Sequence, residues 1–341
     1  MEIKDLTGLS KPLTRLVEVI AQGIGAVSYP YLLKRNAAAK AMEISAIAEA
    51  LDRAAEKHGF EVQYKDGAIE SVKRSSQEIL IAGETSPEDR VANRTKFQEQ
   101  KRQKNLEGVT SAAAAELAYE ETVADECPDE DWVSRFFASA QDVSSEEMQN
   151  LWGRILAGEI KQPGTYSLRT LEFVRNLTRV DAELIDKIGK FALFYGPTAF
   201  IPAHDKAALE GRGIFQGHHF SLGELGVIYP TDLQLRLFRE DDKKQEALLS
   251  GQLLLLVSRG EINNEVQLQI WKFTAIGKEL LNLLQPAEDV GLLEAVAAHF
   301  VKKKGYAELA NVIEHQSDGN IRYQTLRKGF GEDNEAESSP T

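Results

Sequence analysis

The sequence predicts a mainly α fold: a helical hairpin, a long helix and a helical bundle, followed by a winged-helix-like α+β module. Two observations lead to this class. Apolar residues recur at spacings of three and four through most of residues 9–195, which is typical of amphipathic helices. The longest strand-like patterns lie near residues 253–273, between segments with helical spacing.

Residues 1–58 are predicted to form an amphipathic helical hairpin. Ser10 can cap the first helix, and Pro30 should end it because proline lacks a backbone donor and disfavours a helical residue before it. An alanine-rich second helix then runs over about residues 31–57. The side chains of this segment that can contact a partner or a membrane are Leu13, Leu16, Val17, Ile20, Ile24, Tyr29 and Tyr31.

A small β hairpin or linker is predicted for residues 59–85, because residues alternate on either side of Asp66 and Gly67. Ser86 then provides an N-cap, with Pro87 at the first helical position. A long charged helix is therefore expected within residues 86–128, running past Tyr119.

Charge is segregated along this part of the chain. Residues 90–104 hold six basic residues and only Glu99 as an acid, whereas residues 107–151 hold twelve acids and only Arg135 as a base. Opposite charges attract, so the two blocks can pair within one chain or with the matching blocks of a second subunit. The alternative is that they form two solvated helix faces.

A compact helical bundle is predicted over residues 129–200. Ser167 caps one of its helices, and Thr178 with Asp181 begins another that extends to Tyr195. An earlier helix begins at a capping box of Ser144 with Glu147 and ends at Gly158. The predicted core side chains of the first two helices are Trp132, Val133, Phe136, Phe137, Met148, Leu151, Trp152, Ile155 and Leu156.

The winged-helix-like module is predicted over residues 201–290. The apolar run 253–257 and the alternating run 266–273 are expected to form a two-stranded wing around a polar loop, and Thr274 caps a closing helix. Residues 291–331 are expected to form a C-terminal helix and a hairpin that turns at Asp318 and Gly319. The acidic tail, residues 332–341, is predicted to be disordered.

Composition narrows the function classes. The formal net charge of −13 disfavours general attraction to nucleic acid or anionic lipid. The single cysteine, Cys127, cannot form an internal disulfide, and the chain has no signal peptide pattern, so a cytoplasmic location is expected. The uncharged run 19–33 has 15 residues, fewer than the about 20 of a membrane-spanning helix.

Several segments of the chain resemble known families. The stretch "DEDWVSRFFASAQDVSSEEMQNLWGRILAGEIKQPGTYSLRTLEFVRNLTRVDAELIDKI", residues 129–188, resembles the core of the uncharacterised bacterial family catalogued as domain of unknown function 2806. The stretches "KFQEQKRQKNLEGV" (96–109) and "FTAIGKELLNLL" (273–284) resemble the same family. The N-terminal "GLSKPLTRLVEVIAQGIGAVSYPYLLKRNAAAKA" is similar to the start of proteins called abortive infection alpha. These resemblances imply a bacterial or phage-plasmid-borne protein that acts in defence against phage.

No catalytic residues, metal ligands or cofactors are predicted. The chain has no phosphate-binding loop, nucleophile elbow or zinc-protease motif. Only the adjacent pair His218 and His219 suggests a metal, and neighbouring residues of a strand point to opposite faces of the sheet, so the pair chelates poorly. We therefore expect a protein without enzymatic activity of its own.

Nucleic acid is the weaker of the partner predictions. The expected recognition helix, residues 224–239, offers only Arg236 and Arg239, and the expected wing carries Arg259 beside two acids. A winged helix used for protein contacts fits these charges better. If nucleic acid binds, the predicted phosphate contacts are Arg94, Lys96, Lys101, Arg102 and Lys104.

The function predicted from the sequence is anti-phage defence through self-association and contacts with an unidentified protein partner or phage trigger. Two roles remain open for the N-terminal apolar run. It can pack in the core, or it can lie in a membrane interface after activation, with its tyrosines at headgroup depth. The alternative function is a winged-helix regulator that binds DNA or RNA.

Overall fold

The computed structural model describes residues 10–25, 62–65, 68–71, 86–239, 244–262, 265–315 and 321–331. The chain divides into two compact units, Met1–Tyr166 and Ser167–Thr341, here called unit 1 and unit 2. The predicted second helix (31–57), the turn at Asp318 and Gly319, and the tail (332–341) lie outside the described residues.

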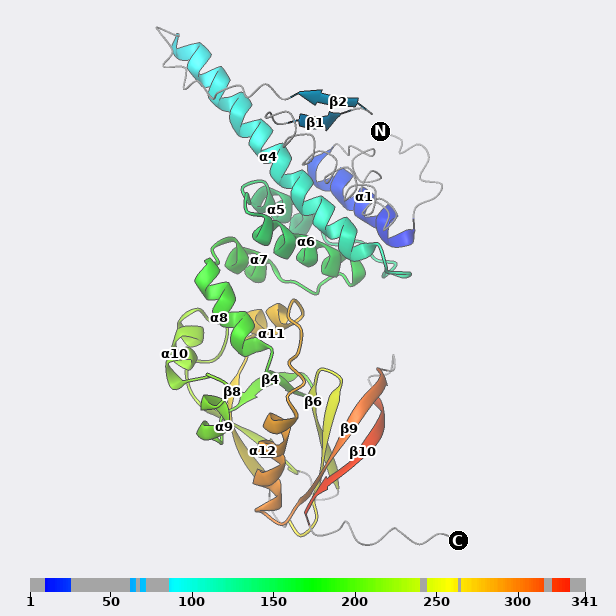
Figure 1. Ribbon diagram of the computed structural model, residues 1–341, viewed down its shortest axis with the longest axis vertical. Helices are drawn as coiled ribbons and strands as arrows, with labels where there is room; N and C mark the ends of the chain where they lie inside the picture. Colours follow the sequence, from blue (N-terminus) through cyan, green and yellow to red (C-terminus); the bar gives the residue numbers. More distant parts are fainter. Residues whose placement is uncertain are drawn as a thin grey trace. The chain divides into compact units, whose positions relative to one another are not determined.

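Unit 1 is built from helices and one small hairpin (Figure 1). The hairpin pairs Lys65 with Ala68, on either side of Asp66 and Gly67. The described elements are α1 (Lys11–Ile24), β1 (Val62–Lys65), β2 (Ala68–Ser71), α4 (Pro87–Leu117), α5 (Glu130–Ala140) and α6 (Glu146–Lys161).

Aromatic rings of α5 and α6 form the centre of unit 1. Phe136 stacks on Trp132 with ring centroids 5.1 Å apart, and its ring lies 5.2 Å from those of Phe137 and Trp152. Helix α6 also lies close against α4: a Cβ added to Gly153 would lie 2.4 Å from the Ala112 side chain. The aromatic core predicted for this segment is confirmed, and a small residue at position 153 allows the two helices to approach.

Three helix boundaries differ from the prediction. Helix α6 begins one residue later than expected, because the Ser145 hydroxyl, and not that of Ser144, accepts a hydrogen bond from the Met148 N–H. The same helix continues past Gly158 to Lys161. Helix α4 has the predicted Ser86 cap but ends at Leu117, so the expectation that it runs past Tyr119 is wrong.

Unit 2 contains an antiparallel sheet of eight described strands in the order β10-β9-β7-β6-β3-β4-β8-β5. These strands are β3 (Leu193–Tyr195), β4 (Thr198–Pro202), β5 (Leu233–Leu237), β6 (Gln245–Ser250), β7 (Leu253–Ser258), β8 (Val266–Lys272), β9 (Tyr306–His315) and β10 (Ile321–Phe330). The helices of the unit are α7 (Leu168–Arg175), α8 (Arg179–Gly189), α9 (Lys206–Glu210), α10 (Gln216–Glu224), α11 (Ala275–Leu281) and α12 (Val290–Val301).

The prediction of a mainly α fold with a winged-helix-like module is wrong. Strands β7 and β8 are present, but they do not pair with each other: β7 lies between β6 and β9, and β8 lies between β4 and β5. The expected recognition helix over 224–239 includes strand β5. Tyr195, expected on a helix, lies on β3. Unit 2 is therefore an α+β unit.

The main core of unit 2 lies between the sheet and α12. Leu293, Val296, Ala297 and Phe300 of α12 are buried in the same cluster as residues from seven of the strands. The Arg212 guanidinium holds the N-terminal end of α12 in place by donating to both oxygens of Asp289, at 2.5 and 2.6 Å. These bonds from Arg212 lower the pKa of Asp289, which also caps α12 through the Leu292 N–H.

Candidate functional site

The N-terminal half of α4 is the most exposed regular element that the structure describes. All residues from Ser86 to Lys101 are exposed, whereas the buried residues of the helix lie between Asn105 and Leu117. In Figure 1 the N-terminal end of α4 extends beyond α5 and α6 of the same unit. Only its C-terminal half contributes to the core that α5 and α6 build, so the N-terminal half is available as a contact surface.

Four basic residues and one aromatic residue line one face of this exposed half. The spacings between them are four, three, four and three residues, which confines the side chains to about 80° of the helix circumference and about 21 Å of its length. Phe97 at the middle of this face is 65% exposed. We call this face the basic stripe; it consists of Arg90, Arg94, Phe97, Lys101 and Lys104.

The structure separates the five basic residues singled out from the sequence. Arg94, Lys101 and Lys104 lie in the basic stripe, but Lys96 lies on another face of the helix. Arg102 is bound on the packed side of α4, where its guanidinium lies 3.0 Å from Glu99 and 3.6 Å from Asp142. The contact with Asp142 joins the basic and acidic blocks within one chain, as the charge pattern allowed.

Phe97 and Arg90 were missed as site residues. The signal was present in the sequence, because a repeat of four and three residues places side chains on one helix face whether they are apolar or charged.

The other end of α4 carries the opposite charge. The segment that follows the helix, residues 119–131, contains seven acids and no base. Some acids of this region are paired: Glu120 with Lys161 at 2.5 Å, and Asp125 with Lys11 at 2.6 Å. The bond from Lys11 also lowers the pKa of Asp125. Unit 1 is therefore positive at one end of its longest helix and negative at the other.

The apolar residues of α1 are used inside unit 1. Leu16, Val17 and Ile20 are buried, while Leu13 and Ile24 are partly exposed. A Cβ added to Gly23 would lie 2.1 Å from the Phe137 ring, so α1 lies directly against α5. Tyr29 and Tyr31 lie outside the described residues.

None of the helices in the described part of the chain combines the length and the apolar character that a membrane span requires.

The adjacent pair His218 and His219 takes part in contacts within unit 2. His218 and His219 lie on α10, not on a strand, and His218 accepts a hydrogen bond from the Phe215 N–H through Nδ1. His219 is buried and stacks on Trp271, and its Nε2 atom lies 3.1 Å from the Tyr229 carbonyl oxygen. Within the described ranges, no three His, Cys, Asp or Glu side chains are placed to hold a metal ion.

A second pair of histidines consists of residues that lie far apart in the sequence of unit 2. The rings of His204 and His299 lie 5.0 Å apart, and their Nε2 atoms lie near the carbonyl oxygens of Ala295 and Gln267. The Nδ1 atom of His204 is buried without a hydrogen-bond partner. Burial lowers the pKa of both imidazoles, and each imidazole also has cationic side chains, such as Lys302, nearby.

We expect this pair to make unit 2 less stable in mild acid. The unfolded chain takes up protons near the ordinary histidine pKa of about 6.5, whereas the folded chain does so only at lower pH, so stability falls as the pH drops below that value. Urea unfolding of a Trp132→Phe/Trp152→Phe background, in which Trp271 is the one tryptophan left, measures the difference by fluorescence at pH 7.5 and pH 5. The variant His204→Gln/His299→Gln should lose less stability between these pH values, and an unchanged loss would contradict the assignment.

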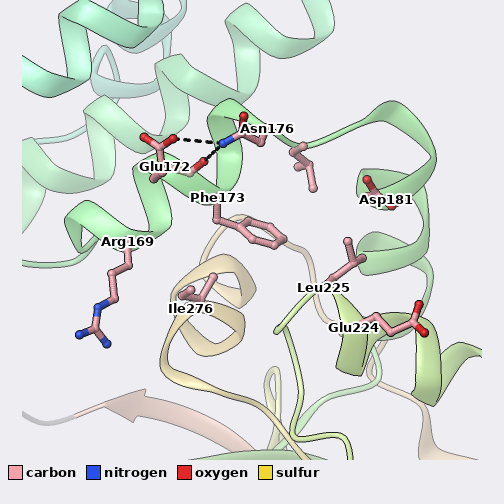
Figure 2. A pocket seen from close by; sticks show the side chains of 9 residues that line it. Arg169, Glu172, Phe173, Asn176, Asp181, Glu224, Leu225 and Ile276 are labelled. Atoms are coloured by element: carbon pink, nitrogen blue, oxygen red, sulfur yellow. Dashed lines mark hydrogen bonds between the residues drawn. The ribbon is translucent and has the colours of Figure 1, made fainter.

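An open pocket with a volume of about 540 Å³ lies among the helices of unit 2 (Figure 2). Phe173 points to its centre, toward Leu225 and Ile276, and Leu177 completes the apolar surface. Three carboxylates surround this surface, those of Glu172, Asp181 and Glu224, together with the guanidinium of Arg169. Ligand sites commonly have volumes of about 300–1,000 Å³ and combine an apolar floor with a few polar groups.

Two contacts hold the pocket walls in place. The N–H of Ser167, at the start of α7, donates to the Glu279 carboxylate of α11 at 2.6 Å. The Thr274 hydroxyl, at the start of α11, donates to the Gly226 carbonyl oxygen at 2.6 Å, next to Leu225. The helices that contribute Phe173, Leu225 and Ile276 are therefore linked by hydrogen bonds as well as by packing.

Unit 1 therefore has an exposed basic helix face, and the α+β unit 2 has an apolar pocket with carboxylates around it. Residues 89–297 match the family model described as protein of unknown function (DUF2806). This match covers more than half of the chain, so the chain belongs to that family. It includes most of α4 and the whole pocket. The comparisons with curated proteins and with solved structures found no match.

Proposed function

We propose that this protein acts without catalysis, by self-association through the basic stripe of α4. The observation that carries the proposal is the exposure of this stripe on a chain with a formal net charge of −13. The surface of an acidic protein complements an exposed positive face, so a second copy offers a matching surface. Charge complementarity speeds the encounter of two such surfaces and fixes their orientation.

The assignment to α4 rests on a comparison with α1. The apolar residues of α1 are already buried against the rest of unit 1, and exposing them would remove their contacts with α5. Arg94, Lys101 and Lys104 can contact a partner without any change in the fold, because they are exposed.

Charge reversal on the stripe tests the proposal. We expect the wild-type protein to have a mass above the 37.8 kDa of one chain by size-exclusion chromatography with light scattering, and to dissociate as salt screens the contact. Arg94→Glu/Lys101→Glu/Lys104→Glu should be monomeric at low salt. Lys96→Glu is the matched control, since Lys96 lies on another face of α4. A wild-type monomer, or an unchanged mass for the triple variant, would contradict the proposal.

For the biological setting we propose defence of bacteria against phage, supported by the similarity of residues 8–41 to abortive infection alpha proteins. Expression in a susceptible host should lower the plaque count of at least one phage in a panel. The triple charge-reversal variant should restore it, and Lys96→Glu should not. Equal plaque counts with and without the protein across the panel would argue against this setting.

A further inference from the structure

We infer that Phe97 of one copy docks into the pocket of unit 2 on a second copy. This inference rests on the proposed self-association and names the surface that the basic stripe contacts. Two independent observations carry it: an exposed phenylalanine flanked by cations on α4, and an apolar pocket flanked by carboxylates in unit 2.

The apolar parts of the two surfaces correspond. Phe97 is 65% exposed at the centre of the stripe, and burying a phenylalanine side chain stabilises a contact because it removes apolar area from water. The pocket offers the partly exposed side chains of Phe173, Leu177, Leu225 and Ile276 in a volume of about 540 Å³. A phenylalanine ring entering there would lie among apolar groups, including the Phe173 ring.

The charged parts also correspond. Arg94 and Lys101 lie one helical turn before and after Phe97, within about 5–6 Å of it between Cβ atoms. Three carboxylates lie around the pocket, those of Glu172, Asp181 and Glu224. Two of them have local partners: Glu172 lies 3.6 Å from Arg175, and Asp181 accepts from the Thr178 N–H at 3.2 Å. Among the described residues, Glu224 has no ion-pair partner and is the best placed for a cation of the stripe.

Arg169, the cationic residue of the pocket lining, does not oppose the contact with the basic stripe. In Figure 2 the Arg169 side chain extends away from the centre of the pocket, whereas Phe173 points into it. The lining therefore presents three negative groups and one positive group to a stripe that has cations on both sides of its phenylalanine.

The stripe and the pocket are different surfaces, so the contact is heterologous. Each copy that gives its Phe97 to a neighbour still has an empty pocket for a third copy. Contacts of this kind generate closed rings or open filaments. We therefore expect species larger than a dimer as the protein concentration rises.

Single variants test both halves of the contact. Phe97→Ala and Glu224→Lys should each weaken association at least about tenfold in sedimentation velocity, the size of effect expected for a central contact residue. Val91→Ala is the control for the helix, because Val91 is exposed on another face of α4. Glu210→Lys, an exposed site outside the pocket lining, is the control for charge. Both controls should associate like the wild type.

A mixing experiment tests the pairing itself. At a concentration where neither Phe97→Ala nor Glu224→Lys assembles alone, a mixture should form a dimer and stop there, because it contains one intact stripe and one intact pocket per pair. A charge swap, Lys101→Glu with Glu224→Lys in one chain, should recover part of the lost association.

Three outcomes would overturn the inference. If Glu224→Lys behaves like Glu210→Lys while the triple stripe variant is monomeric, the stripe binds another surface of the second copy, and the proposed function survives. If the triple stripe variant also keeps the wild-type mass, both the inference and the proposed function are wrong. If nuclease treatment removes the large species, the stripe binds nucleic acid instead of a second copy.

Discussion

Phe136→Ala is expected to lower the free energy of unfolding of unit 1 by about 3–5 kcal/mol, the usual cost of truncating a buried aromatic side chain to alanine. Phe136 is completely buried, and three aromatic rings lie within 5.2 Å of its own, between ring centroids. Those rings belong to Trp132, Phe137 and Trp152, on two helices that α4 crosses. Because they are themselves packed on all sides, they cannot collapse into the space that the truncation leaves.

The measurement requires a signal from unit 1 alone. The chain has three tryptophans, and Trp271→Phe leaves only Trp132 and Trp152, both in unit 1. Urea unfolding of this background, at a concentration where the chain is monomeric, gives the reference stability. Phe97→Ala is the matched control and should change it by less than about 0.5 kcal/mol, because Phe97 is exposed. Equal effects of the two substitutions would contradict the assigned core.

The helices could be predicted from the sequence because their signals are local. The N-caps at Ser86, Ser167, Thr178 and Thr274 each bond to a backbone N–H three residues later, so both partners are visible in a short stretch of sequence. The choice between Ser144 and Ser145 was missed because adjacent serines offer the same hydroxyl group, and only the backbone geometry decides which one caps.

The sheet could not be predicted in the same way, because strand pairing is not local. The apolar run of β7 correctly indicated a strand, but its pairing partners are β6, which is adjacent in sequence, and β9, which begins nearly 50 residues later. The uniform burial of Leu253–Val257 is typical of a central strand covered on both faces, and a two-stranded wing would leave one face of these residues exposed.

The same difference between local and non-local signals decides which candidate site could be predicted from the sequence. The basic stripe lies within one helix, so its residues can be found from spacing alone. The pocket combines α7, α8, α10 and α11, and Ile276 lies about 100 residues from Phe173 in the sequence. No spacing rule brings such positions together, since their proximity depends on the sheet topology.

Glu159→Ala should lower the stability of unit 1 by about 2–5 kcal/mol, because it would remove two hydrogen bonds to a charged acceptor, one of them from the buried Tyr166 N–H. Glu159 is 2% exposed, and its oxygens accept from the N–H groups of Gly164 and Tyr166 at 2.6 and 2.9 Å. The Tyr166 carbonyl oxygen in turn accepts from the Trp132 indole at 2.7 Å, so this carboxylate holds a loop that contacts the aromatic core.

Glu159→Gln keeps the size of the side chain and changes only its charge and its hydrogen-bonding groups. Glutamine keeps one acceptor oxygen but places an amide donor opposite the other N–H, so we expect a loss between zero and that of the alanine variant. Glu121→Ala, an exposed acid of the same unit, should change stability by less than about 0.5 kcal/mol. Urea unfolding in the Trp271→Phe background, followed by Trp132 and Trp152 fluorescence, measures the stability of all three variants. If the alanine variant were as stable as Glu121→Ala, the loop would not depend on the buried carboxylate.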